Sequence, residues 1–373
     1  MDAGSRHAFG AHFTSEADIQ KVVRPTIVRP WRDRIAAASN LRELRALADG
    51  LLEYRVLDPA CGSGNFLYVA YRELVNIEME ILIKIHENFG EKARGAAGTA
   101  SLVSTKQFYG IDRDSFGVEL AKVTLMLAKR VALAEIYDNW FTQRSIEKES
   151  PLPLDNLDDN IHCDDALFAD WPKADAIIGN PPYQSKNKMQ QEFGPAYLNR
   201  VRDRYPDVPG RADYCVYWFR RAHDELRDGA RAGLVGTNTI RQNYSREGGL
   251  DYIVGNGGTI TEAVSSQVWS GEATVHISIV NWLKGDQPGK KNLFRQLGDK
   301  RESPWEVEAV DRIGASLSGR FDVTAASPLR ANKDSDTCNQ GQTHGHKGYL
   351  LDWDDGKAMI SKDPRNSDVI RLI

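Results

Sequence analysis

The sequence predicts an α/β protein with a doubly wound, Rossmann-like sheet of mostly parallel strands. From residue 54 onward, short apolar segments alternate with longer amphipathic segments, the pattern of strands and crossover helices in such a sheet. Several apolar segments end in aspartate, asparagine or glycine, at the strand ends where ligands bind in these folds. Two late apolar segments, 259–264 and 273–282, are separated only by a short turn region and predict a terminal antiparallel hairpin.

The chain ahead of the sheet is predicted to be helical over residues 12–50. Thr14 and Ser15 precede Glu16 and can cap a helix, and leucines recur at helical spacing from Leu41 to Leu51. The sequence therefore predicts an N-terminal helical segment, residues 1–50.

The remaining elements follow in order along the chain. Strands are expected at 54–57, 108–111, 161–162, 174–178 and 232–236, and helices after the first two strands and over 214–226. The first of these helices has a predicted apolar face of Phe66, Ala70, Leu74, Ile77 and Ile81, and the second covers 118–133. Loops are expected at 90–105, in the acidic stretch 151–159 and in the polar stretch after residue 183.

The composition changes after residue 285. Residues 286–373 are rich in Gly, Asp, Lys and Ser and have few periodic apolar positions. We therefore expect a sheet domain over residues 51–285, followed by a C-terminal extension that is part of a second, incomplete unit.

Length and composition exclude several classes of protein. The 373 residues, 41% apolar and 27% charged, suffice to bury a core and have the balance of a globular protein. No apolar run reaches the ~20 residues of a membrane-spanning helix, and the first residues lack a signal-peptide core. The four cysteines are spaced neither as zinc ligands nor as a disulfide framework, which predicts reduced thiols, no metal site and a cytoplasmic protein. The net charge of −4 means that any nucleic-acid site is a local patch.

The first two strand ends carry residues suited to a nucleoside. After the first strand, Gly62 and Gly64 allow a tight turn and a close backbone approach to a ligand. The third glycine of a dinucleotide pattern is missing, since position 67 is Leu. Asp112, after the second strand, can accept both hydroxyls of a ribose. The alternative for Gly62 and Gly64 is an ordinary turn between a strand and a helix, and the alternative for Asp112 is an aspartate that caps the next helix.

The third and fourth strand ends carry polar motifs. Asp164-Asp165 could accept from an adenine amine or be solvated. Asn180-Pro181-Pro182-Tyr183 is a tetrapeptide that seldom occurs by chance after an apolar strand. The Asn oxygen and a backbone carbonyl fixed by the Pro-Pro step can accept both hydrogens of a poorly nucleophilic nitrogen, and the Tyr ring can face a planar substrate. The alternative is a rigid proline-rich turn.

Together these residues resemble the S-adenosylmethionine-dependent N6-adenine DNA methyltransferases. The stretch Asp58–Phe66 resembles their cofactor-binding motif I, and Asn180–Tyr183 their catalytic motif IV. Asp112 and Asp165 match the acidic residues that meet the cofactor ribose and adenine, and Thr14 matches a motif X threonine at the methionine moiety. The resemblance implies a methyltransferase sheet, catalysis by Asn180, Pro181, Pro182 and Tyr183, and S-adenosyl-L-methionine bound by Thr14, Asp58, Ala60, Gly62, Gly64, Asn65, Phe66, Asp112 and Asp165.

The match is closer still to the methyltransferase region of MmeI-like (type IIL/IIG) restriction–modification proteins, over roughly residues 10–285. The segments 212–222, 234–242 and 268–282 add to this likeness. The resemblance implies that double-stranded DNA is the partner and that a flipped target adenine stacks between Tyr183 and Trp269.

Two departures from the family shape the expected domain content. Only nine residues precede the match, and the chain contains no Glu-x-Lys triplet of the family's nuclease. The family's recognition domain is expected to begin near residue 373. We therefore expect a methyltransferase core, with 286–373 the start of a target-recognition region and with the nuclease and full recognition domain absent.

Basic side chains outnumber acidic ones directly after the Pro-Pro motif. Lys186, Lys188 and Arg200 are the expected contacts to the DNA backbone, with a solvated face as the alternative. Two other functions stay open: methylation of RNA or of a protein glutamine, and an inactive specificity fragment of a restriction system.

Overall fold

The computed structural model describes residues 14–90, 103–140, 155–184, 186–269, 275–320 and 351–370, without the side chains of 136–140, 186 and 187. The chain divides into two compact units, Met1–Ala325 and Ala326–Ile373. In the second unit, the helix α11 (Trp353–Lys362) is followed by a short 3-10 turn, η7 (Pro364–Asp368). No helix among the described residues is long and apolar enough to cross a membrane.

Nine strands of the first unit form one sheet in the order β3-β2-β1-β4-β5-β7-β6-β8-β9. Strands β1 to β5 are mutually parallel, and β7 runs antiparallel to both β5 and β6. The strands are β1 (Val56–Asp58), β2 (Phe108–Asp112), β3 (Ile161–Cys163), β4 (Ala176–Gly179), β5 (Arg231–Thr237), β6 (Gly258–Val268), β7 (His276–Lys284), β8 (Lys291–Gln296) and β9 (Trp305–Val310). The predicted doubly wound sheet and its antiparallel pair are confirmed.

The parallel strands separate two apolar cores because alternate residues point to opposite faces. Val56 of β1 and Ile178 of β4 belong to one core, whereas Leu57 and Ile177 belong to the other. The central strands are therefore buried on both faces, as expected for a parallel sheet covered by helices.

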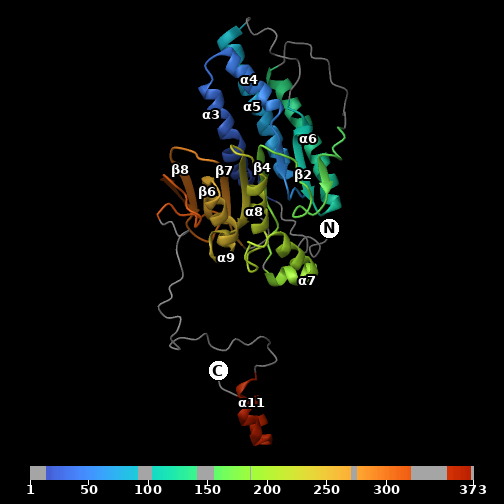
Figure 1. Cartoon of the computed structure of the whole chain (residues 1–373), viewed down its shortest axis with the longest axis vertical. Coiled ribbons are helices and arrows are strands. Elements are labelled where there is room, and N and C mark those ends of the chain that lie inside the picture. Colours follow the sequence, from blue (N-terminus) through green and yellow to red (C-terminus); the bar gives the residue numbers. More distant parts are fainter. Residues whose placement is uncertain are drawn as a thin grey trace. The chain divides into compact units, whose positions relative to one another are not determined.

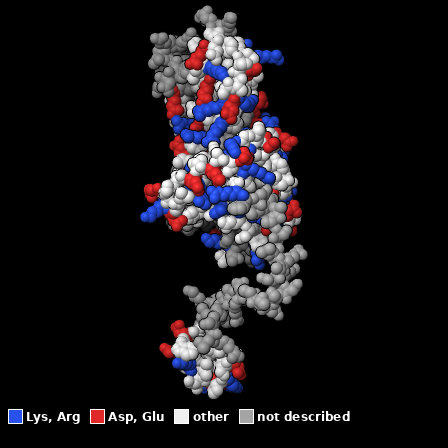
Figure 2. All heavy atoms as spheres, turned by 90° about the vertical axis from the view of Figure 1, so that its left-hand side faces the viewer, with Lys and Arg blue, Asp and Glu red and all other residues white. Residues whose placement is uncertain are grey.

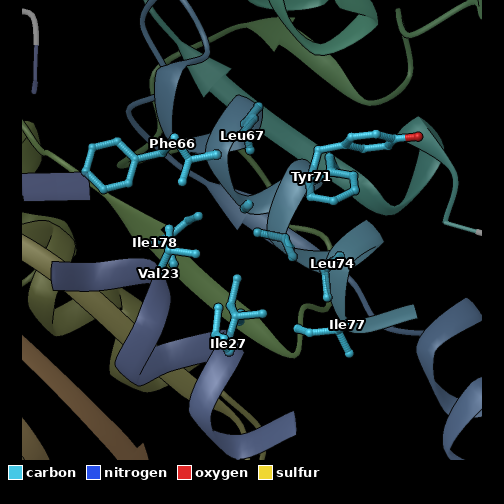
Figure 3. Close-up of a cluster of buried hydrophobic side chains, with 14 of the residues drawn as sticks. Val23, Ile27, Phe66, Leu67, Tyr71, Leu74, Ile77 and Ile178 are labelled. Atoms are coloured by element: carbon cyan, nitrogen blue, oxygen red, sulfur yellow. The ribbon is translucent and has the colours of Figure 1, made fainter. Parts of the chain in front are cut away.

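The first core lies against the long helix α5 (Asn65–Phe89), which follows β1. Its predicted apolar face is confirmed: Phe66, Ala70, Leu74, Ile77 and Ile81 are all at most 4% exposed. Figure 3 shows Val23 and Ile27 of the N-terminal helices close to Leu74 and Ile178 in this core. The next strand, β2, is followed by α6 (Ser115–Trp140), which packs beside α5.

The described part of the N-terminal segment is helical from Glu16 onward, as predicted. It comprises α2 (Glu16–Val23), a π-helical turn η1 (Arg24–Val28), α3 (Arg29–Ala37) and α4 (Leu41–Leu52). Ser15 caps α2, and its hydroxyl accepts a hydrogen bond from the backbone N–H of Asp18 at 3.3 Å. The buried residues of α2 and η1 attach this segment to the sheet domain.

The second core lies against α8 (Val216–Glu225), where Phe219 stacks on Trp282 of β7 at 5.7 Å between ring centroids. Figure 1 shows α7 (Lys186–Arg204) and α9 (Asn243–Arg246) at one end of the sheet and α3 and α4 at the other. Because α7 follows β4 and α9 follows β5, the end with α7 and α9 is where the carboxyl ends of the parallel strands lie.

The polar stretch after residue 183 is helical rather than a loop. Helix α7 (Lys186–Arg204) bends at Gly194, which has φ 76° and precedes Pro195. Met189, Leu198 and Val201 are buried in the second core, and this apolar contact stabilises a helix whose sequence is mostly polar.

The sheet continues past residue 285. Strand β8 pairs in parallel with β6, and β9 pairs with β8 in the antiparallel sense. The first part of the expected extension therefore adds two strands to the same sheet, and the first compact unit runs to Ala325.

Candidate active site

The loop after β1 is held in place by backbone hydrogen bonds. The N–H of Gly64 donates to the carbonyl of Cys61 at 2.7 Å, and the N–H of Cys61 donates to the carbonyl of Ile111 at 3.1 Å. Gly62 and Gly64 have φ of 49° and 84°, which favour glycine. At Gly64, a Cβ would lie 2.9 Å from the Cα of Ala121, so only glycine allows α5 to begin this close to α6.

Asp58, at the end of β1, is fully buried. Its Oδ1 accepts the N–H of Ala60 at 3.0 Å, while its Oδ2 is buried without a hydrogen-bond partner among the described residues. Burial raises the pKa of Asp58 to about 8. An unpartnered buried oxygen of this kind suits a cationic or hydrogen-bond-donating ligand group.

Asp112, at the end of β2, binds two backbone amides. Its Oδ2 accepts the N–H of Gly62 at 2.9 Å, and its Oδ1 accepts that of Asp114 at 3.0 Å. Burial raises its pKa, although these hydrogen bonds oppose the shift. The carboxylate thus joins the first two strand ends, and each oxygen keeps a second lone pair for a ligand.

Asp165, after β3, lies under an aromatic cluster. Its Oδ2 accepts the hydroxyl of Tyr197 from α7 at 2.8 Å, and the guanidinium of Arg113 lies 3.9 Å away. The hydroxyls of Tyr197 and Tyr214 are 2.6 Å apart. Burial raises the pKa of Tyr197, so its hydroxyl remains a donor to Asp165 at neutral pH. The ring of Phe193 lies 5.1 Å from that of Tyr197 and extends the cluster.

Asn180, directly after β4, is the centre of a hydrogen-bonded group. Its Nδ2 donates to the hydroxyl oxygen of Thr14 at 3.1 Å, and its Oδ1 accepts the hydroxyl of Tyr183. Pro181 is buried, and Pro182 is partly buried beside it. The side-chain amide is therefore fixed from both sides.

Trp269 lies beside Tyr183. Their ring centroids are 6.4 Å apart at an interplanar angle of 81°, so the rings meet edge to face. Trp269 is 1% exposed, and its Nε1 has no hydrogen-bond partner among the described residues. The tryptophan is thus adjacent to the Pro-Pro motif, and a base between parallel rings would require one ring to turn.

Helix α8 and the turn before it position the loops that follow β1 and β4. The carboxylate of Asp213 accepts the backbone N–H of Gln184, the residue after Tyr183, at 3.2 Å and the hydroxyl of Thr237 at 2.9 Å. The Nε1 of Trp218 donates to the carbonyl of Pro59 at 2.9 Å. One segment of the chain therefore holds both the β1 loop and the β4 loop.

The predicted DNA-backbone residues all belong to α7. Lys188 is exposed, and the side chain of Lys186 lies outside the described part of the structure. Arg200 is exposed, with its guanidinium carbon 3.7 Å from the ring centroid of Phe168, near Asp165.

The structure brings most of the predicted residues to one edge of the sheet. Phe66 is packed in the first core, and Asn65 Nδ2 donates to Ser63 Oγ at 3.3 Å within the loop. Sequence reasoning missed Arg113, Tyr197, Asp213 and Tyr214. The Asp213-Tyr214 pair lies in the segment 212–222, whose sequence contributes to the family likeness. The contact of Tyr197 with Asp165 instead depends on the fold of α7.

The sheet order and the residues at the strand ends define a methyltransferase-like α/β protein. The family model described as "MmeI, DNA-methyltransferase domain" matches residues 35–295. The chain therefore belongs to the family of MmeI-type DNA-methyltransferase domains.

Longer proteins are similar to this chain. DNA methyltransferase A of Bacillus subtilis is 27% identical over 363 residues, which are 93% of this chain and 39% of that protein. The adenine-specific methyltransferase PglX of Streptomyces coelicolor is 23% identical over 71% of this chain and 24% of its own length. The structure of the type IIL restriction–modification enzyme MmeI in complex with DNA matches 87% of this chain and 43% of that chain, with a TM-score of 0.69 and 26% identity. The chain thus spans about two fifths of the first of these relatives.

Proposed function

We propose that this chain transfers the methyl group of S-adenosylmethionine to the exocyclic N6 amine of a flipped adenine in DNA, within a restriction–modification or host-defence system. The observation that carries this proposal is the fixed amide of Asn180, held by Thr14 and Tyr183 at the same sheet edge as Asp58 and Asp112. Family membership supports the same reaction. We also propose that residues after the sheet begin a target-recognition region.

The residues at the β1 and β2 ends fit the proposed cofactor. The unpartnered Oδ2 of Asp58 suits an amino group, and a Cβ at Gly62 would meet nothing within 4 Å, so the loop is open there. Asp112 would hold the ribose hydroxyls and Asp165 the adenine amine, with Thr14 near the methionine end. When bound, the cofactor supplies a methyl group whose bond to sulfur breaks as the bond to nitrogen forms.

Asn180 and the proline backbone would orient the target amine. The lone pair of an exocyclic amine is delocalised, so acceptors for both of its hydrogens favour the tetrahedral geometry that attack needs. The Oδ1 of Asn180 would accept one hydrogen, and a backbone carbonyl of the Pro-Pro step the other. Asn180 cannot act as a base at neutral pH, and the alkylated amine is acidic enough to release its proton to water.

Extrusion of an adenine from a duplex costs a few kcal/mol. Stacking on Tyr183, and on Trp269 after a ring rotation, would return about 1–3 kcal/mol per face. Lys186, Lys188 and Arg200 would contact phosphates from α7.

The test is methyl transfer from labelled cofactor to duplex DNA, to RNA and to protein as separate acceptors, followed by digestion of the nucleic acids to nucleosides. Label in N6-methyladenine supports the proposal. Label only in RNA or in protein glutamine would favour a methyltransferase of another substrate. No label on any acceptor, with DNA still bound, would favour an inactive specificity fragment.

A further inference from the structure

Arg241 is a partly buried cation without an acidic partner. It ends the turn η4 (Asn238–Arg241), which directly follows β5, the neighbour of β4 in the sheet. Its Nε donates to Oδ1 of Asn238 at 2.7 Å. Within the described ranges, no carboxylate lies within ion-pair distance of its guanidinium. Because burial disfavours an unpaired charge, this position suits a bound anion.

The charge of a second arginine, Arg295, acts on Arg241. Burial lowers the pKa of Arg241, and the charge of Arg295 on β8 lowers it further. The guanidinium of Arg295 lies 3.1 Å from the carboxylate of Glu306. The Arg295 side chain is nevertheless 58% exposed. An arginine remains charged at neutral pH, so the repulsion between these two cations would be relieved by an anion.

An open groove of about 450 Å³ includes one residue of the segment that follows Arg241. It is lined by Arg202, Pro209, Gly210, Arg211 and Tyr244. Tyr244 lies on α9, three residues after Arg241, and is 44% exposed. The guanidinium carbon of Arg211 lies 5.9 Å from its ring centroid. Neither Arg202 nor Arg211 has a carboxylate partner in the part of the chain that the structure describes.

Overall charge does not single out this region. Figure 2 shows the face beside β8, where Lys and Arg side chains are interspersed with Asp and Glu. The distinguishing feature is therefore Arg241, an arginine without an ion-pair partner among the described residues, which follows the carboxyl end of β5, one strand from Asn180.

We propose that Arg241, together with the groove of Arg202, Arg211 and Tyr244, binds backbone phosphates of the DNA strand that carries the target adenine. The inference rests on the proposed function and deepens it. Neighbouring strands in a sheet are about 4.8 Å apart, so a phosphate at the end of β5 is close enough for its nucleotide to reach Asn180 at the end of β4. Arg241 and Tyr244 follow β5, whereas Arg200 lies beside Phe168 after β3, and Arg202 belongs to the same helix as Arg200, α7.

The test compares duplex binding by fluorescence anisotropy over a range of salt concentrations, using the full chain and a short mixed-sequence DNA duplex. The variants are Arg241→Gln, Arg241→Lys and the double variant Arg202→Gln/Arg211→Gln. The matched control is Arg45→Gln, an exposed arginine on α4 at the opposite end of the sheet. Cofactor affinity, measured by calorimetry, reports whether each variant keeps its fold.

Arg241→Gln is expected to weaken binding about tenfold at low salt, because a charge-assisted contact is lost. The slope of log affinity against log salt should fall by about 0.9 for Arg241→Gln and by up to about twice that for the double variant. Arg241→Lys should keep the slope, since lysine also binds phosphate as a point charge. Arg45→Gln should match the parent.

Parental affinity and slope in Arg241→Gln and in the double variant would overturn the inference. So would an equal loss in Arg241→Lys, or a loss of cofactor affinity that accompanies the loss of DNA binding. A parent chain that neither binds duplex nor methylates it would instead overturn the proposed function, so the two failures are distinguishable.

Discussion

Asn180 donates its side-chain N–H to the hydroxyl oxygen of Thr14, a residue 166 positions earlier in the chain, at 3.1 Å. The contact orients the amide, because the nitrogen faces Thr14 and the oxygen faces Tyr183. The start of the helical segment is thereby attached to the end of β4, and Thr14 itself is 4% exposed.

Thr14→Val should lower the rate of methyl transfer about fivefold, since a hydrogen bond worth about 1 kcal/mol no longer fixes the Asn180 amide. Thr14→Ser keeps the hydroxyl and should retain most of the rate. Single-turnover methylation of duplex DNA measures both. Equal rates in Thr14→Val and the parent would show that Thr14 does not position Asn180.

Asn180→Ala should abolish methyl transfer and leave cofactor affinity within about twofold of the parent, because the lost acceptor acts on the target amine. Calorimetry with S-adenosylmethionine measures the cofactor affinity, and methylation with labelled cofactor measures the rate of methyl transfer. Near-parental rates would mean that the tetrapeptide is only a rigid turn.

Asp112→Ala should weaken cofactor binding strongly, since two ribose hydroxyls would lose a charged acceptor worth about 1.5–3 kcal/mol per bond. Gly64→Val should do the same, because a side chain at φ 84° would meet the Cα of Ala121. Calorimetry measures both affinities, and circular dichroism checks that the sheet is retained. Unchanged cofactor affinity in both variants would show that the cofactor does not bind at the β1 and β2 ends.

The raised pKa of the Asp58 carboxyl group predicts that stability and cofactor binding depend on pH. Its pKa is about 8 in the folded chain, above its ordinary value near 4, so the folded state binds more protons between these values. This contribution to stability is therefore full below pH 4 and is lost as the pH rises toward 8, by up to about 1.4 kcal/mol per pH unit. A cationic ligand group at the unpartnered Oδ2 would favour the ionised carboxylate, so binding near pH 7 should release protons.

The measurement is calorimetry in two buffers with different ionisation enthalpies, together with thermal unfolding from pH 5 to 8. Asp58→Asn is the matched control, because a neutral amide of the same shape has no proton to release. Equal proton release from the parent and from Asp58→Asn would exclude Asp58 as the group that titrates.

Local patterns in the sequence sufficed to predict the strand ends. Asp58 and Asp112 end short apolar strands and Asn180 directly follows one. Parallel strands place such residues at the same edge of the sheet, whatever the conformation of the loops. The buried face of α5 could be predicted because its period matches a helix with one apolar side.

Contacts between distant segments could not be predicted from local patterns. The hydroxyl of Tyr197 reaches Asp165 only because α7 packs its few apolar residues on the second core, and the Gly194-Pro195 step hides its helical period. Strand β8 has only two apolar residues, Leu293 and Phe294, and strand β9, at the sheet edge, leaves Trp305 and Val307 largely exposed. From the sequence alone such a pattern is typical of a loop, because these residues form strands only when β8 can pair with β6.

Tyr183→Ala should lower both the rate of methyl transfer and the affinity for substrate DNA, whereas Tyr183→Phe should keep most of both. The ring supplies the stacking surface, about 1–3 kcal/mol per base, whereas the target amine would replace the hydroxyl at Oδ1 of Asn180, and Thr14 would still orient the amide. The loss in Tyr183→Ala should be smallest for a target adenine opposite a mismatched base, because less of the cost of extrusion remains to be offset. Single-turnover rates on matched and mismatched duplexes measure this difference. A loss of the same size on both duplexes would mean that Tyr183 acts after the base has left the stack, and a loss in Tyr183→Phe equal to that in Tyr183→Ala would assign the role to the hydroxyl instead of the ring.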